Sequence, residues 1–447
     1  MKIVKASEVG EYAIEKMLTK ASFDEVELSP KIREANKKTF GRDMTAAELV
    51  RQIVGDVRRE GDAAVIRYTH LIDRVDYKPE DFLVTEAEYE AAGKAADPAV
   101  VESLRKAAEN VRCYHQEQKP NSWMTYREKG SILGQSIIPL DRVGIYVPGG
   151  TAAYPSSVIM NAVPASVAGV GEIIMMVPPK NGKINPYVLI AARAAGVKKI
   201  YKIGGAQAIA AMAFGTETIP RVDKITGPGN IFVTLAKKEV YGHVDIDMLA
   251  GPSEILIVAD KTADPVYTAA DMLSQAEHDP LASSIVITDD AELAEKVAKE
   301  AEKQLAALPR REIAQASIDR NGLIVVADDM MQAMRFANVS APEHMELLTA
   351  QPFQLLPYVR HAGAVFLGAY SPEPLGDYFA GPNHVLPTGG TARYYSVLNV
   401  ETFMKRTSII SYTQPALSDV SEDIIRLAET EGLQAHANAI RIRREQK

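Results

Sequence analysis

Short apolar runs alternate with amphipathic segments along the middle of the chain. Near-continuous apolar runs are typical of strands buried on both faces of a sheet, and segments with apolar residues at helical spacing, such as 185–195 and 291–308, supply the covering helices. The predicted strands are 143–147, 173–177, 199–203, 254–259, 284–288, 322–326 and 363–367. This alternation predicts an α/β fold in which right-handed helical crossovers join parallel strands.

So many strands exceed one compact domain, so the pattern predicts two sheets. The expected fold class is α/β, with two Rossmann-like parallel-sheet domains, an N-terminal helical arm and a C-terminal helical tail. The N-terminal region is expected to pack partly on the first α/β domain. The predicted boundaries are 1–130 for the N-terminal helical region, 131–245 and 246–380 for the two α/β domains, and 381–447 for the tail.

Several helix ends are marked by capping residues. Side chains that accept a hydrogen bond from the first turn, followed by an acidic residue or a proline, predict helix starts. These pairs are Thr45 with Glu48, Asp97 with Pro98, Asp264 with Pro265, and Asp419 with Glu422. Two closing helices are predicted at 420–431 and 436–445, and Gly432 ends the first of them.

The composition is that of an ordinary soluble globular protein. The 447 residues are 47% hydrophobic and 24% charged, and the formal net charge is -8. An acidic chain of this kind is not expected to bind nucleic acid or a charged membrane surface. The opening residues from Met1 to Lys5 lack the apolar core and cleavage site of a signal peptide, so we expect a cytoplasmic location.

Residues 155–179 are apolar enough to raise the question of a membrane span. Pro164, Gly169, Gly171 and Glu172 interrupt the segment. It therefore predicts a helix, a turn and a buried strand.

Cys113 is the single cysteine, which excludes an intramolecular disulfide and a cysteine-rich zinc cluster. It lies in a predicted helix, where we expect it to be a packing residue. A thiol-dependent aldehyde dehydrogenase is therefore disfavoured.

The end of the predicted helix that begins at Asp264 carries Gln275 and His278. The apolar stripe expected for this helix is Val266, Ala269, Ala270 and Leu273. At about 100° per residue, Gln275 and His278 are expected about 60° apart on the other side, close enough to share one ligand. Histidine is a good zinc donor and an amide oxygen an unusual one. A solvent-facing helix end fits the local pattern equally well.

Glu343 and His344 follow the helix-breaking Pro342. An imidazole is the best general base at neutral pH, and a glutamate can orient or deprotonate a water. Adjacent residues on a strand or helix point in different directions, so the pair is expected to serve two sub-sites. On its own the dipeptide also fits an ordinary surface position.

Three glycine-rich turns each follow a strand-like run and open toward a helix: 149–151, 204–207 and 227–230. Backbone N–H groups in such turns suit phosphate oxygens. None of the turns is a dinucleotide fingerprint or a Walker loop, and glycine is common in such turns for structural reasons. Nucleotide binding therefore stays open at this point.

Taken together, the motifs resemble the histidinol dehydrogenase family. They occur in the order of that family, and they are 146–151, 204–211, 227–230, 247–254, 273–278, 342–344, 376–378, 381–389 and 431–436. The resemblance implies an NAD-dependent, zinc-containing homodimer that oxidises L-histidinol through histidinal to L-histidine. It assigns NAD to the domain at 131–245 and zinc and catalysis to the domain at 246–380, and it implies that the tail at 381–447 contacts the partner subunit.

The resemblance also implies roles for individual residues. One zinc ion per subunit would be bound by Gln275, His278, Asp377 and His436, which also contact the substrate. Glu343 and His344 become the acid–base pair, and His344 contacts the substrate as well. The remaining substrate contacts are Ser253, His384 and Glu431, and the NAD contacts are Tyr146, Gln207 and Asn230. The tail of one subunit is expected to complete the zinc site of the other.

Two rival functions are weighed against this one. Another zinc- and NAD-dependent alcohol dehydrogenase on the same scaffold, for example one acting on a sulfonated diol, would keep Glu343, His344 and the zinc site. It would have less use for Glu431 and His384, which suit a cationic substrate. A non-catalytic metal-binding or assembly protein is the rival from a different class.

Overall fold

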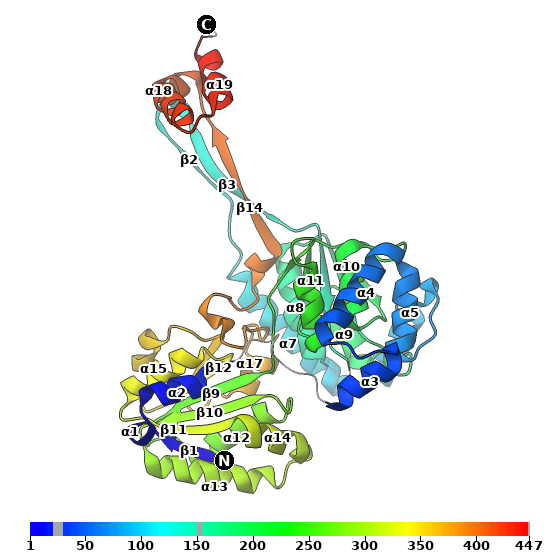
Figure 1. Ribbon diagram of the computed structural model, residues 1–447, viewed down its shortest axis with the longest axis vertical. Helices are drawn as coiled ribbons and strands as arrows, with labels where there is room; N and C mark the ends of the chain where they lie inside the picture. Colours follow the sequence, from blue (N-terminus) through cyan, green and yellow to red (C-terminus); the bar gives the residue numbers. More distant parts are fainter. Residues whose placement is uncertain (21–29, 150–153, 446–447) are drawn as a thin grey trace.

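The computed structural model describes residues 1–20, 30–149 and 154–445. Two α/β domains lie side by side, and an arm projects from them and carries the C-terminus (Figure 1). The described residues form one parallel sheet in each domain and an antiparallel sheet in the arm. The predicted α/β class with two parallel sheets is therefore confirmed.

The first α/β domain contains a parallel sheet with the strand order β6-β5-β4-β7-β8. The strands are β4 (Arg142–Tyr146), β5 (Glu172–Met176), β6 (Lys199–Tyr201), β7 (Lys224–Thr226) and β8 (Asp245–Ile246). Along β5, Ile173 and Met175 enter one core, and Ile174 and Met176 enter the other. The strand order reverses between β4 and β7, where α/β proteins commonly bind ligands beyond the carboxyl ends of the strands.

Helices cover both faces of this sheet. One face carries α3 (Pro30–Phe40), α4 (Ala46–Glu60), α5 (Asp62–Asp73), α10 (Gly205–Phe214) and α11 (Ile231–Val240). The other carries α6 (Glu86–Ala95), α7 (Pro98–Gln116), α8 (Pro155–Ala168) and α9 (Pro186–Ala194). Thr45 and Glu48 form the predicted capping box of α4, and Asp97 caps α7.

The apolar stretch 155–179 folds as predicted, into α8, a left-handed turn at Gly169 and β5. In the described parts of the chain, no helix is both long and apolar enough to span a membrane.

The second α/β domain contains a parallel sheet with the strand order β1-β11-β10-β9-β12-β13. The strands are β1 (Lys2–Lys5), β9 (Glu254–Ala259), β10 (Ser283–Thr288), β11 (Gly322–Val326), β12 (His344–Leu348) and β13 (Ala364–Leu367). One face carries α1 (Ala6–Val9), α2 (Glu11–Leu18), α15 (Met330–Ser340) and α16 (Pro352–Leu355), and the other carries α12 (Pro265–Ala276), α13 (Ala291–Leu305) and α14 (Arg311–Asn321).

The first residues of the chain belong to a different domain from the one predicted. Strand β1 belongs to the sheet of the second α/β domain and not to a helical region that ends at residue 130, because it pairs in parallel with β11. The contact joins residues far apart in the sequence. A four-residue edge strand flanked by lysines leaves no apolar run from which the pairing can be read.

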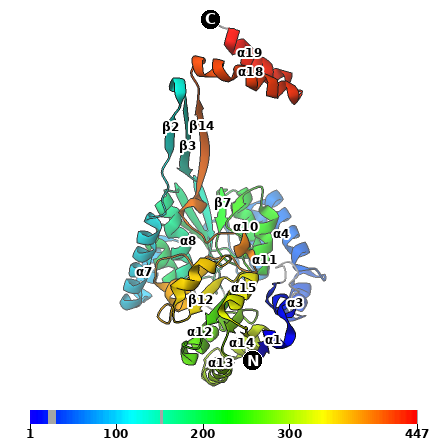
Figure 2. The same cartoon turned by 90° about the vertical axis from the view of Figure 1, so that its left-hand side faces the viewer.

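The antiparallel sheet of the arm was not predicted, although the two helices that close the chain were. Strands β2 (Trp123–Tyr126), β3 (Ile132–Pro139) and β14 (Met404–Ser411) form an antiparallel sheet, and α18 (Gln414–Thr430) and α19 (Gln434–Glu445) lie at its far end (Figure 2). The arm therefore takes β3 from the predicted first α/β domain and β14 from the predicted tail. Much of this sheet faces solvent, so its strands mix polar and apolar residues and lack the run typical of a buried strand.

The first closing helix begins earlier than predicted. Thr413 caps α18, and its side chain accepts a hydrogen bond from the backbone N–H of Ala416, while Pro415 occupies the first turn. Asp419 instead forms an ion pair with Lys129 of the arm. The prediction that Asp419 and Glu422 start this helix is therefore wrong.

Cys113 is exposed on α7 and is not a packing residue as expected. The buried positions of α7 are Ala107, Ala108, Val111 and His115. Cys113 falls outside that stripe.

Candidate active site

The candidate acid–base pair lies at the amino edge of the second sheet. Glu343 directly precedes β12, and its neighbour in the sheet, β9, begins at Glu254. Helix α12 runs back across the sheet and ends at the same edge, before β10. Ligand sites of open α/β sheets usually lie at the opposite, carboxyl edge. The candidate acid–base pair of this domain therefore lies at the edge of the sheet that binds ligands less often.

The backbone of Glu254 orients both members of the pair. Its N–H donates a hydrogen bond to Oε2 of Glu343 at 2.8 Å, and its carbonyl oxygen accepts one from Nδ1 of His344 at 2.9 Å. Nδ1 thus carries a proton, which leaves Nε2 as the basic nitrogen of a neutral ring. Oε2 of Glu343 lies 3.7 Å from Nδ1 of His344. The two side chains are closer than alternation along a strand predicts, because Glu343 lies just before the strand begins.

Burial and neighbouring charges tune this pair. Burial raises the pKa of Glu343 to about 8. For His344, burial lowers the pKa, but the nearby carboxyl groups of Glu343 and Asp377 outweigh it and raise the pKa to about 10. Burial also raises the pKa of Asp377, yet the imidazoles of His384 and His344 hold it well below its usual range. Asp377 is therefore ionised at neutral pH.

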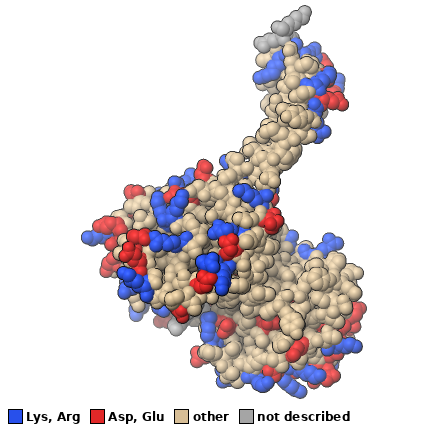
Figure 3. Space-filling model, turned by 180° about the vertical axis from the view of Figure 1, so that it is seen from behind, with Lys and Arg blue, Asp and Glu red and all other residues tan. Residues whose placement is uncertain are grey.

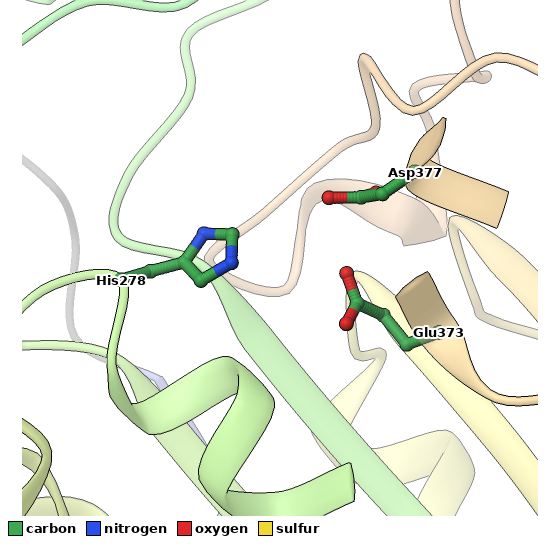
Figure 4. A group of neighbouring side chains, drawn as sticks. All are labelled: His278, Glu373 and Asp377. Atoms are coloured by element: carbon green, nitrogen blue, oxygen red, sulfur yellow. The ribbon is translucent and has the colours of Figure 1, made fainter. Parts of the chain in front are cut away.

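His278, Glu373 and Asp377 form a candidate metal site. One ligand atom from each residue lies within 4.8 Å of the others. Figure 4 shows the His278 ring and the two carboxyl groups pointing toward a common space, with the carboxyl groups projecting from α17 (Glu373–Tyr378). Partial burial lowers the pKa of His278, because it disfavours the charged imidazole, while the rest of the side chain is exposed to solvent. A neutral imidazole beside carboxylates is suited to a divalent cation such as zinc.

Gln275 and His278 are placed differently from the prediction. Asp264 caps α12 as expected, but the helix ends at Ala276, and a turn from the His278 N–H to the Gln275 carbonyl sets His278. Gln275 is fully buried, and neither atom of its amide has a partner among the described residues. The expected stripe is only partly right, since Val266 and Ala270 are exposed and face away from the sheet.

Glu373 was not predicted. Its carboxyl group is 1% exposed and accepts a hydrogen bond of 2.7 Å from Oγ of Ser274. Glu373 and Asp377 are four residues apart, the spacing that brings two side chains to one face of a helix. Proline on both sides of Glu373 favours a helix start there. The spacing of Glu373 and Asp377 could have indicated the site from the sequence. Helix α17 is too short, however, for a repeat of apolar residues to predict it as a helix.

His384 also joins the site. Its Nδ1 lies 3.0 Å from the Asp377 carbonyl oxygen and 3.6 Å from Oδ1. The preceding Asn383 fixes this segment to the first domain by donating a hydrogen bond of 2.6 Å to the Met160 carbonyl. His344, Asp377 and His384 line a cavity of about 300 Å³. Ser253 lies directly before β9, at the same edge of the sheet.

The candidate metal site meets the carboxyl edge of the first sheet. Asp377 and Tyr378 line a small hollow together with Pro155 and Ser156, the first residues of α8. Gly149 follows β4, and a Cβ atom there would approach Pro178 to 2.5 Å. Gly150 and Thr151 lie outside the described residues. The two domains thus bring the start of α8 and the candidate metal site to the same hollow.

The predicted NAD contacts lie along this edge of the first sheet. The Tyr146 hydroxyl, whose pKa burial raises to about 12, accepts a hydrogen bond of 3.1 Å from the Gly205 N–H. Gln207 is fully buried, and its amide has no partner among the described residues. Asn230 caps α11. A Cβ atom on Gly227, which has φ 108°, would lie 2.1 Å from the Tyr146 carbonyl, so that turn requires glycine.

Glu431 and His436 are not brought to the site within this chain. Glu431 caps α18, and His436 lies in the first turn of α19, both exposed. These helices stand at the end of the arm, far from β12 and α17 (Figures 1 and 2).

Comparison with known proteins identifies the family. The sequence model described as histidinol dehydrogenase matches residues 36–444. Curated histidinol dehydrogenases of Carboxydothermus hydrogenoformans and Bacillus subtilis are 57% and 56% identical over 88% of this chain, and the matches cover 93% and 92% of their lengths. The crystal structure of histidinol dehydrogenase from Elizabethkingia anophelis, 35% identical, has a TM-score of 0.90 and covers 99% of this chain and 98% of its own. The chain belongs to the histidinol dehydrogenase family.

Membership in the histidinol dehydrogenase family confirms the predicted activity. The chain is an oxidoreductase of histidine biosynthesis that oxidises histidinol to histidine. The rival alcohol dehydrogenase is not favoured, because the match to histidinol dehydrogenases extends over most of the chain. The solved relative covers nearly the whole length, so the arm belongs to the histidinol dehydrogenase fold.

Proposed function

We propose that the chain oxidises L-histidinol through L-histidinal to L-histidine in two NAD-dependent, zinc-assisted steps. One observation carries the proposal: Nε2 of the buried His344 lies 3.8 Å from Asp377, which also belongs to a cluster able to hold a cation. A base for a hydroxyl proton and ligands for a Lewis acid thus meet at one point, as metal-assisted alcohol oxidation requires.

The proposed zinc ligands are Gln275, His278 and Asp377 of one subunit and His436 of the partner subunit, with one ion per subunit. The residues fit such an ion because His278 and Asp377 approach each other closely and the buried Gln275 amide lacks a partner among the described residues. An unsatisfied buried amide is costly unless a ligand completes it. When bound, zinc would supply a Lewis acid that fixes the nitrogens of the substrate and polarises its alcohol.

NAD is proposed to bind at the carboxyl edge of the first sheet, in contact with Tyr146, Gln207 and Asn230. The reversal of strand order between β4 and β7, the glycine-rich turns and the unpartnered Gln207 amide support this position. Bound NAD would accept hydride from a substrate held at the amino edge of the other sheet. Asp377 lines the same small hollow as the start of α8, which supports that juxtaposition.

His344 is proposed to remove the hydroxyl proton of histidinol through Nε2, since Nδ1 is engaged by Glu254. A cation on Asp377 would weaken one of the charges that raise the pKa of His344, which brings the ring closer to the range of a general base. Glu343 is proposed to activate the water that adds to the aldehyde. Both residues lie at one buried site, so the reactive aldehyde need not leave between the two steps.

Ser253, His384 and Glu431 are proposed to contact the substrate, as are the zinc ligands and His344. The cavity beside His344, Asp377 and His384 has room for a small molecule. The amino-imidazole of histidinol is basic, so a carboxylate at Glu431 suits the part of it that zinc does not bind.

The enzyme is proposed to act as a homodimer with crossed arms, so that Glu431 and His436 of the partner subunit complete each site. Large apolar side chains on the arm are exposed in the single chain, and they include Trp123, Met124, Tyr126, Ile410 and Leu427. Figure 3 shows a largely uncharged surface along the stalk of the arm. Apolar surface of this kind indicates an interface with another protein.

Three further predictions stay predictions: a cytoplasmic location, no nucleic-acid partner and no membrane partner. On the face seen in Figure 3, acidic and basic residues are interspersed over both domains. That mixture gives no support to a nucleic-acid surface.

The experiment that tests the function measures NADH formed per histidinol consumed. Two NADH and one histidine are expected, with little free histidinal, because the aldehyde stays bound. A chelator should stop the reaction and added zinc should restore it. One NADH per histidinol with accumulating aldehyde would contradict the two-step proposal, and no NADH at all would contradict the activity.

A further inference from the structure

Glu346 lies at the junction of the elements that build the active site. It is 0% exposed and sits on β12, two residues after His344, so both side chains project from the same face of the sheet. All five residues of β12 are buried, and the strand lies between β9 and β13. No step proposed above uses Glu346, yet an acidic residue is rarely buried this deeply without a role.

One oxygen of Glu346 holds the start of α17. Oε1 accepts a hydrogen bond of 2.8 Å from the backbone N–H of Glu373. That N–H belongs to the first turn of α17 and has no partner inside the helix. Because α17 is only six residues long, this bond fixes the helix that carries both Glu373 and Asp377.

Asp271 of α12 lies near the Glu346 carboxyl group, and its charge adds to burial in raising the pKa of Glu346. Burial favours the neutral form, raising the pKa of Asp271 to about 6 and that of Glu346 well above its usual range. Helix α12 carries Asp271 one turn before Gln275, and its Ser274 hydroxyl bonds Glu373. Glu346 thus joins β12 to α17, and the bond from Ser274 to Glu373 joins α17 to α12.

We propose that Glu346 is a positioning residue, which holds α17 against α12 so that Asp377 and Glu373 face His278. The part of this inference that concerns zinc rests on the proposed function, whereas the position of α17 does not. The residue acts through the hydrogen bond that it accepts from the Glu373 N–H, which a neutral acceptor can also form.

Three variants separate these possibilities. In Glu346→Gln the amide oxygen can still accept the hydrogen bond from the Glu373 N–H. Glu346→Leu keeps the size of the side chain but cannot accept that bond. Glu346→Asp keeps the acid but is one methylene shorter, so it cannot reach the Glu373 N–H from the same backbone position, and it decides the matter if the leucine variant fails to fold. Val325→Ala, a core change on the other side of the same sheet, controls for general destabilisation.

The first measurement is hydrogen–deuterium exchange of residues 372–379 in metal-free enzyme. Exchange should be faster in the leucine and aspartate variants and near wild type in the glutamine variant and in Val325→Ala. The second is zinc affinity by competition with a chelator, together with kcat and KM. Zinc affinity should fall about 10- to 100-fold in the leucine and aspartate variants and by less than about threefold in the glutamine variant.

The outcomes are distinguishable. Loss of protection or of zinc in Glu346→Gln as large as that in Glu346→Leu, or larger than that in Glu346→Asp, would overturn the proposal, because the acidic group and not the accepted hydrogen bond would then matter. Unchanged exchange in both Glu346→Leu and Glu346→Asp would overturn it as well. If wild-type enzyme binds no zinc, the proposed function fails, while the exchange measurement still decides the role of Glu346.

Discussion

His278→Ala and Asp377→Ala are each expected to lose bound zinc and turnover while keeping the fold. Each change removes one of four proposed protein ligands, and neither side chain belongs to a hydrophobic core. Loss of a Lewis acid worth several kcal/mol should lower kcat by on the order of a thousandfold or more. Zinc is measured by elemental analysis of the purified variants, turnover by NADH formation, and the fold by circular dichroism.

A matched control comes from the same chain. His70 and Asp76 form an exposed histidine–aspartate contact of 2.6 Å remote from the site, so His70→Ala and Asp76→Ala should retain zinc and activity. Full zinc occupancy in His278→Ala and Asp377→Ala would show that these residues are not ligands. Glu373→Ala adds a comparison, since a loss of zinc as complete as in Asp377→Ala would make Glu373 a ligand in its own right.

Glu343→Gln and His344→Asn are expected to damage different half-reactions. His344→Asn removes the base proposed for the hydroxyl proton and should slow histidinol oxidation by about 10²- to 10⁴-fold. Glu343→Gln keeps an oxygen that can accept from the Glu254 N–H, so the geometry should survive, but it removes the group proposed to activate water. Histidinal oxidation should therefore fall by a similar factor in this variant. The two steps are measured separately, with histidinol and histidinal as substrates.

Equal losses of both steps in both variants would contradict this division of roles. The contact of 3.7 Å between the two side chains makes some coupling expected, so the ratio of the two half-reactions is compared between the variants. Zinc content is measured in parallel. A variant that has lost its metal says nothing about the acid–base roles.

The buried strands could be predicted because burial on both faces leaves an unbroken apolar run. Strands β9 and β10, for example, are buried at every position and lie within a residue of their predicted bounds. Strand β12 is equally buried, but its sequence His-Met-Glu-Leu-Leu breaks the run. The two polar residues that interrupt the apolar run are His344, the proposed base, and Glu346, the proposed positioning residue. Residues with proposed roles in the active site therefore prevented the prediction of this strand.

The antiparallel sheet of the arm and the first strand could not be predicted, because their pairing is non-local and their sequences mix polar and apolar residues. Strand β14 pairs with β3 across more than half of the chain, and β1 pairs with β11. Such pairings follow from the whole fold and not from local propensity.

The candidate site could be predicted only through the motifs. The structure brings Glu343, His344, His278, Asp377 and His384 together, which local patterns left open. Glu373 was missed because it lies outside every matched motif. Gln275 was expected on an outer face of α12 and is buried, because the helix packs its polar end against the sheet.

The central proposal is an active site completed by the arm of a second subunit, and mixing two inactive variants tests it most directly. His278→Ala and His436→Ala chains are unfolded together and re-assembled in equal amounts, and mixed dimers are verified by native mass spectrometry. With crossed arms, one site of each mixed dimer carries both substitutions and the other site carries neither. Random pairing makes about half of the dimers mixed, so activity should return to roughly a quarter of wild type. Mixed dimers without recovered activity would contradict the proposal, because each arm would then serve its own chain.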